Sequence, residues 1–152
     1  MNLDDFKYLL EMSPNLYHLA VNFELFKSFV DAESLSDLLK QRITHVLIAT
    51  SLTTTMETIV ESIEKFSIIL PKLRHLYFHL ESTDYLIKPL IQSVLTCLPH
   101  WKDLISFGVT NTQLEDLTTS EQIRQWIIDN SHLTDEHLFH VDYSDMTFRL
   151  WL

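Results

Sequence analysis

Glycine is almost absent from this sequence. The chain has one glycine, Gly108, and four prolines among 152 residues, whereas soluble proteins average about 7% glycine. Tight hairpins and phosphate-binding loops need residues that tolerate positive φ. The scarcity therefore argues against a β-sandwich, a dinucleotide-binding fold and a P-loop.

Cysteine is equally scarce. Cys97 is the only one, so the chain cannot form an internal disulfide. The first residues are acidic where a signal peptide would be basic. No apolar run approaches the roughly 18 residues that a membrane span requires. We therefore expect a protein of the cytoplasm or nucleus without membrane association.

The charge balance is strongly negative, at −10. Between residues 110 and 146 there are eight acidic residues and only one basic residue, Arg124. An acidic surface repels phosphates, so we expect no nucleic-acid partner. The acidic segment is either a solubilising surface or a site for a basic protein partner.

Four short segments align as an internal repeat. Each has an aliphatic or aromatic residue at its first, fourth and sixth positions, and the starts lie 27, 30 and 31 residues apart. Their composition predicts short β-strands. The segments are residues 16–21, 43–48, 73–78 and 104–109, anchored by Leu16, Ile43, Leu73 and Leu104.

Between these segments the apolar spacing becomes helical. The linker after the second strand has apolar residues every three or four positions, and so does the linker after the third. The first linker predicts two shorter helical stretches interrupted at residues 31–34. The two regular stripes consist of Ile59, Ile63, Phe66 and Leu70, and of Leu90, Ile91, Val94, Leu95 and Leu98.

Helix starts are also marked in the sequence. Thr54 with Glu57, and Thr118 with Glu121, have the spacing of capping boxes. Pro89 fits the first turn of a helix that begins near Lys88.

Strand and helix alternating every 30 residues or so predict βαβ units and a parallel sheet. The sheet could be doubly wound, with helices on both faces, or a curved solenoid with helices on one side. Doubly wound strands are continuously apolar, but here the third position of each segment is polar: His18, His45, His75 and Ser106. We therefore predict an α/β fold, a short solenoid of about four β-α repeats with one open sheet face.

This pattern resembles the leucine-rich repeat, L-x-x-L-x-L, in its long form with a full helix per repeat. Residues 14–19 and 71–76 match the motif best, and residues 123–152 resemble the C-terminal end of divergent F-box/leucine-rich-repeat proteins. The resemblance implies a protein-interaction module, which in an F-box-type ubiquitin ligase subunit would be the substrate-recognition part. It departs from the family at the ninth position, which holds Glu24, Ser51, Glu81 and Thr112 where the family has Asn or Cys.

No F-box-like segment precedes the first repeat, so binding to a ligase adaptor would need an F-box upstream. The alternative is a partner-dependent or non-functional fragment of a longer repeat protein. Within one domain over residues 1–152 we predict an N-terminal capping helix (1–13), repeats (14–118), and a C-terminal helix and β-hairpin cap (119–152). Phe6, Leu9 and Leu10 would cover the first repeat, and residues 139–143 and 148–152 would form the hairpin.

In such a fold the third, fifth and seventh positions of each segment face outward on the open side of the sheet. This face is either a solvated surface, a partner-binding patch with Leu47 and Tyr77 as apolar anchors, or, least expected, a metal site. We expect no cofactor and no metal. The predicted surface comprises His18, Ala20, Asn22, His45, Leu47, Ala49, His75, Tyr77, His79, Ser106, Gly108 and Thr110.

A second cluster lies near the C-terminus. It could serve a small hydrolase, but its spacing matches neither H-E-x-x-H nor the inverted zinc motif, so we predict a turn before a strand. Cys97 and the three tryptophans are expected to be core or cap residues. The cluster contains His132, Asp135, Glu136, His137, His140 and Asp142.

Overall fold

The computed structural model describes residues 3–82, 86–114, 116–134 and 138–152, without the side chains of residues 33, 34 and 36. These residues form an α/β fold with one open six-stranded sheet in the order β1-β2-β3-β4-β6-β5. The strands are β1 (His18–Asn22), β2 (His45–Ala49), β3 (His75–His79), β4 (Ser106–Thr110), β5 (His140–Ser144) and β6 (Thr147–Trp151). The first four are parallel, and β6 joins β4 and β5 in antiparallel pairing.

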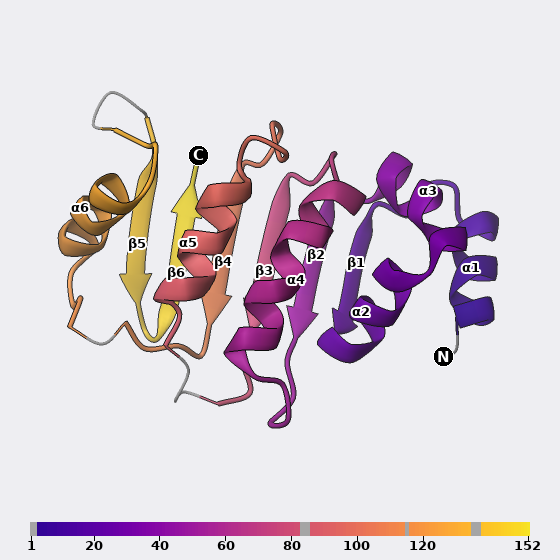
Figure 1. Ribbon diagram of the computed structural model, residues 1–152, viewed down its shortest axis with the longest axis horizontal. Coiled ribbons are helices and arrows are strands. Elements are labelled where there is room, and N and C mark those ends of the chain that lie inside the picture. The colour runs from indigo at the N-terminus through magenta and orange to yellow at the C-terminus, as the bar shows by residue number, and fades with distance from the viewer. Residues whose placement is uncertain (1–2, 83–85, 115, 135–137) are drawn as a thin grey trace.

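Helix α1 precedes β1, and the other described helices connect the strands. Figure 1 shows α4 and α5 lying over the sheet, α1 beyond β1 at one end and α6 beside β5 at the other. Because the parallel strands follow one another in chain order without a reversal, the sheet is not doubly wound. The helices are α1 (Leu3–Met12), α2 (Phe23–Asp31), α3 (Glu33–Arg42), α4 (Met56–Ile69), α5 (Lys88–Cys97) and α6 (Ser120–Asn130).

The predicted repeat register is confirmed. His18 pairs with His45, His45 with His75, and His75 with Ser106. Residues at the fourth and sixth positions of the segments point into the core, where Val46, Ile48, Leu76 and Phe78 are buried. Successive side chains of each strand thus alternate between a helix-covered face of the sheet and a more open face.

The strands begin two residues later than predicted. At the second position of the first three segments, the backbone carbonyl accepts two hydrogen bonds instead of the one of a regular ladder. The carbonyl of Tyr17 accepts hydrogen bonds from the backbone N–H groups of both Thr44 and His45. The carbonyl of Thr44 accepts two in the same way from the third segment, and that of Arg74 accepts two from the fourth. The same arrangement, one carbonyl that accepts two N–H groups, therefore occurs just before β2, β3 and β4. It aligns neighbouring segments before the regular strand pairing starts.

The turns after β2 and β4 are bonded to the turn after β3 by side chains at the eighth position of the repeat. The Thr50 hydroxyl accepts a hydrogen bond from the Glu81 N–H at 3.2 Å, and the Asn111 side chain donates to the Leu80 carbonyl at 2.7 Å. Asn111 also has a φ of 60°, a conformation that asparagine tolerates better than most residues. Cross-repeat bonds therefore form without Asn at the ninth position.

The predicted helices are present, with small shifts at their starts. The first linker forms α2 and α3, separated at Ala32, whose extended backbone interrupts the helix. The caps are one residue later than predicted: Thr55 caps α4, and Thr119 forms a capping box with Gln122 on α6. The sequence offers adjacent threonines at both places, so spacing alone did not select the cap.

The N-terminal helix α1 packs against α2 and α3. Phe6 and Leu10 of α1 are fully buried and the Phe6 ring stacks on Phe29 at 3.8 Å, but Leu9 is 43% exposed and its predicted covering role is wrong. α1 has a narrower buried stripe than its sequence suggested.

At the other end, β5 and β6 form the predicted hairpin. Its turn consists of Asp145 and Met146, both at positive φ, the geometry of a two-residue type I′ turn. Phe148 and Leu150 of β6 are fully buried. Among the described helices, none has the length and hydropathy needed to span a bilayer.

Candidate functional site: the open face of the sheet

Three histidines form a column at the amino ends of β1, β2 and β3. The ring centroids of His18 and His45 lie 3.8 Å apart, and those of His45 and His75 lie 4.2 Å apart. Tyr17 meets His18 edge to face at 4.7 Å. We call His18, His45 and His75 the histidine column. It arises because each side chain occupies the same register position on neighbouring parallel strands, which lie about 4.8 Å apart.

Polar contacts fix the orientation of two of these rings. His45 Nδ1 lies 2.9 Å from the Thr44 hydroxyl, and His75 Nδ1 lies 2.7 Å from the Ser106 hydroxyl. The Ser106 hydroxyl also lies 2.8 Å from that of Tyr77. Ser106 therefore ties the end of the column to the Tyr77 side chain.

Two histidines of the column, His45 and His75, have lowered pKa values, which favour their neutral forms. Desolvation, followed by the neighbouring histidines and Arg74, lowers the pKa of His45 below its ordinary value of 6.5. Desolvation, then Arg74 and His18, lowers the pKa of His75 in the same direction. Each cationic neighbour opposes protonation, so His45 and His75 gain protons less readily than isolated histidines would.

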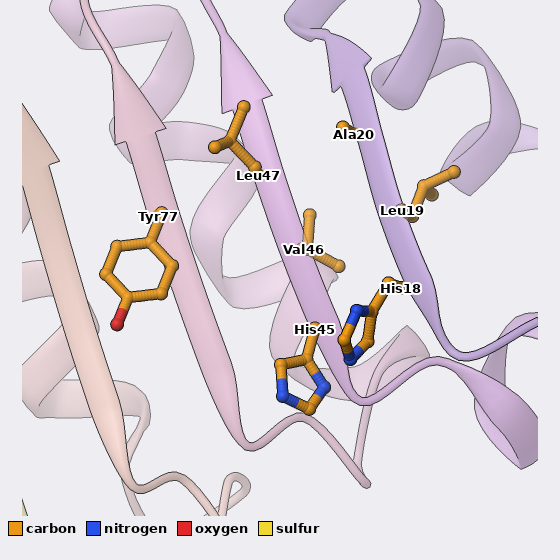
Figure 2. A pocket seen from close by; sticks show the side chains of 7 residues that line it. All are labelled: His18, Leu19, Ala20, His45, Val46, Leu47 and Tyr77. Carbon is orange, nitrogen blue, oxygen red and sulfur yellow. The ribbon is translucent and has the colours of Figure 1, made fainter.

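A shallow depression of about 280 Å³ lies beside the column. Figure 2 shows the rings of His18 and His45 side by side, with Leu47 and Tyr77 farther along their strands. Leu47 is 44% exposed, whereas its chain neighbours Val46 and Ile48 are buried in the core. The depression thus combines imidazole, aliphatic and phenol surfaces; its lining residues are His18, Leu19, Ala20, His45, Val46, Leu47 and Tyr77.

Most of the predicted outward residues are exposed or half-buried, whereas two residues of β4 are buried. His18, Ala20, Asn22, Leu47 and His79 are exposed, and His45, Ala49, His75, Tyr77 and Thr110 are half-buried. Ser106 is only 3% exposed, and Gly108 is buried as well. The expectation that these two are accessible is wrong, because the Tyr77 side chain reaches across to Ser106 and lies over Gly108.

The structure also adds residues that the sequence argument missed. Ser106 pairs with Trp151, and Trp151 pairs with His140. The row that begins with the histidine column therefore continues across the hairpin, where the His140 and Trp151 rings lie 5.3 Å apart. The next row along the strands continues from Gly108 to Arg149 and Asp142. Alternation within the hairpin marks these positions, but only the pairing partner of β4 places them in the rows.

The C-terminal cluster of the sequence is not assembled as one site within the described residues. His140 contacts Trp151, Asp142 lies 3.7 Å from Arg149, and His132 is exposed. Asp135, Glu136 and His137 lie outside the described residues, as does Glu115 of the acidic segment. In the described ranges, no three or more His, Cys, Asp or Glu side chains are grouped so that they could hold a metal ion.

Cys97 and Trp101 are buried in the core, as predicted, while Trp126 and Trp151 are half-buried. Burial raises the pKa of the Cys97 thiol, partly opposed by a hydrogen bond with Ser67. A thiol with a raised pKa is a poor nucleophile at neutral pH.

Comparisons with protein-family models, with curated proteins and with solved structures find no match to this chain.

Proposed function

We propose that this chain is a leucine-rich-repeat-like solenoid that serves as a protein-interaction module, with the open sheet face as its binding surface. Sequential parallel strands in matching register, with helices over the opposite face, support the solenoid assignment. Solenoids of this kind build extended concave surfaces from equivalent positions of successive repeats. A curved sheet with helices on one side would present the histidine column and its neighbours to a partner.

The exposure of Leu47 is the observation that carries this proposal. It is the apolar residue in the middle of a row that also contains Ala20 and Tyr77, beside the depression described above. Interfaces concentrate their binding energy in a few apolar and aromatic anchors surrounded by polar groups. Leu47 and Tyr77 have the chemistry of such anchors.

The wider context of the module stays a prediction. It would serve as the substrate-recognition part of a ubiquitin ligase subunit only if an F-box lies upstream of this chain, and otherwise it would bind its partner as a free module or as part of a longer repeat protein. A cytoplasmic or nuclear location fits the single buried cysteine. The acidic segment 110–146, which is distinct from the open face of β1 to β3, is either a solubilising surface or a site for a basic partner.

Affinity capture from native cells tests the role of the open face. We expect Leu47→Glu to remove the specific partners that the unaltered chain captures, because it places a charge among the apolar anchors. Leu52→Glu is the matched control, since Leu52 is 72% exposed in the turn after β2. Circular dichroism verifies that both variants are folded. Full retention of partners by the Leu47→Glu variant would refute the proposal.

A further inference from the structure

The charge around the histidine column is opposite in sign to that of the whole chain. The chain carries −10, yet every charged neighbour that influences the pKa of His45 or His75 is a base: the other histidines and Arg74. Arg74 is exposed and immediately precedes β3. This corner of the open face is therefore a local basic site on an acidic protein.

The groups that face the column come from several elements. At its base, Arg74 lines a hollow with Lys102 and Asp103 from the loop before β4. Farther across the face, Asp142 and Arg149 lie within 3.7 Å of each other, so the carboxylate there is already accompanied by a cation. Among the described residues, Tyr17 meets His18 edge to face, and the Tyr77 hydroxyl bonds the Ser106 hydroxyl that engages His75. His140 lies in the same row, two strands beyond Ser106.

Two histidines of the column, His45 and His75, can also donate hydrogen bonds to a ligand. The Nδ1 atoms of His45 and His75 are engaged by Thr44 and Ser106. Within the described part of the chain the Nε2 atoms of both rings have no hydrogen bond, and a protonated imidazole donates from both nitrogens. A carboxylate is the acceptor that a protonated imidazole and a guanidinium both favour.

We propose that the open face binds an acidic–apolar peptide segment of a partner protein, with a carboxylate at the histidine column and Arg74 and an apolar side chain against Leu47 and Tyr77. This inference rests on the proposed role of the open face in binding and names the chemistry of its partner. A lysine or arginine in the same place would bring a further positive charge toward Arg74 and the imidazoles. Charge complementarity at an interface favours the acidic partner.

Proton uptake would accompany this binding. Desolvation and, after it, cationic neighbours lower the pKa of His45 and His75 in the free protein, and a bound carboxylate stabilises their protonated forms. The bound complex therefore holds more protons than the separate molecules. By linkage, the association constant rises as pH falls, by at most about tenfold per pH unit for each proton taken up.

Three capped peptides test the inference with the full chain. The first has the sequence Ser-Glu-Glu-Leu-Phe-Ser, the second replaces both glutamates with glutamines and the third replaces them with lysines. We expect the glutamate peptide to shift the amide resonances of β1, β2 and β3 and to bind about three- to tenfold more tightly at pH 6 than at pH 7. The glutamine peptide should bind weakly without this pH dependence, and the lysine peptide should bind least.

Variants of the protein test which side chains cause the pH dependence and the peptide binding. His45→Gln with His75→Gln should abolish the pH dependence, and Arg74→Gln should weaken binding of the glutamate peptide at both pH values. His132→Gln is the matched control, because His132 is exposed and lies outside the sheet. An unchanged pH dependence in the double variant would overturn the inference.

Other outcomes separate this inference from the proposed function. Equal binding of the glutamine and glutamate peptides at β1 to β3 would overturn the acidic preference while leaving the open face as a binding surface. Absence of binding by the glutamate peptide would overturn the inference, whereas the binding role of the face is judged by the Leu47→Glu capture. Acid-induced self-association in sedimentation would show that the occupant is the acidic segment of a second copy, and would likewise overturn it.

Discussion

The ring of Tyr77 lies directly over the α-carbon of Gly108 on the neighbouring strand. A Cβ atom built on Gly108 would lie 2.6 Å from Tyr77 Cδ1 and 2.7 Å from Cε1. The hydroxyl of the same ring reaches Ser106 at 2.8 Å. The only glycine of the chain therefore provides room for an aromatic side chain that bridges β3 and β4.

We expect Gly108→Ala to destabilise the protein by about 1–3 kcal/mol, because the new methyl group overpacks against Tyr77. Urea unfolding measures the change in the free energy of unfolding. The control is the same substitution in a Tyr77→Ala background, where the added methyl meets no ring and should cost little. An equal loss in both backgrounds would show that contact with Tyr77 is not the cause.

Removal of residues 139–152 should expose β4 and cause aggregation. The deleted hairpin supplies Phe148 and Leu150, both fully buried, and the whole antiparallel partner of β4. An uncovered strand edge and apolar face are both templates for association. Size-exclusion chromatography and light scattering give the answer, and a soluble, folded, monomeric truncation would refute the capping role.

A single substitution in the hairpin tests the same packing through the free energy of unfolding. Phe148→Ala should cost about 3–5 kcal/mol, the range for truncating a buried phenylalanine. Thr147→Ala is the local control, because Thr147 is only half-buried and should have a much smaller effect. Similar losses for the two variants in urea unfolding would contradict the packing role of Phe148.

Acidification should weaken the folded state through the histidine column. The folded pKa values of His45 and His75 lie below the ordinary value of 6.5, so near and below that pH the unfolded chain binds more protons. Their contribution is complete above about pH 6.5 and is lost as pH falls through the folded pKa values. We expect a lower Tm at pH 5.5 than at pH 7.5.

The double variant His45→Gln with His75→Gln isolates this contribution from that of the carboxylates. Its Tm should fall less between the two pH values, whereas the His132→Gln variant should follow the unaltered chain. Differential scanning calorimetry without any peptide measures all three proteins. An undiminished fall in the double variant would mean that the column does not contribute to the acid sensitivity.

Cys97 should react slowly with a thiol reagent in the folded protein. Its side chain is buried, and burial raises its pKa, so both access and thiolate population are low. We expect labelling by Ellman's reagent at neutral pH to be at least about a hundredfold slower in the folded chain than in urea, because it requires an opening of the core. Equal rates would place Cys97 at the surface and reopen a chemical role for it.

Local patterns predicted most of the secondary structure because each one is short-range. The stripe through Ile59, Ile63 and Phe66 predicts α4 from its own spacing, and the interruption between α2 and α3 follows from residues 31–34. Spacing alone does not select the cap of α4, since Thr54 and Thr55 offer the same hydroxyl one residue apart. The choice depends on the path by which the chain leaves β2.

The candidate site was predicted in part. Equivalence of His18, His45 and His75 within a repeat predicts their stacking, because parallel strands align equal positions. The burial of Ser106 could not be predicted, since it depends on the rotamer of Tyr77 one strand away. His140 and Trp151 were assigned to a cap, and only the insertion of β6 between β4 and β5 places them in the same row as the column.

By itself the sequence determined the repeat register, the helix-covered face and the identity of the outward positions, because the periods of strands and helices are properties of neighbouring residues. The tertiary structure decided which outward side chains are accessible and which of them meet. Pairing of β4 with β6 rather than β5, and the Tyr77 ring over Gly108, join residues about 30 or more positions apart. No local period encodes such contacts, since they depend on how complete elements pack.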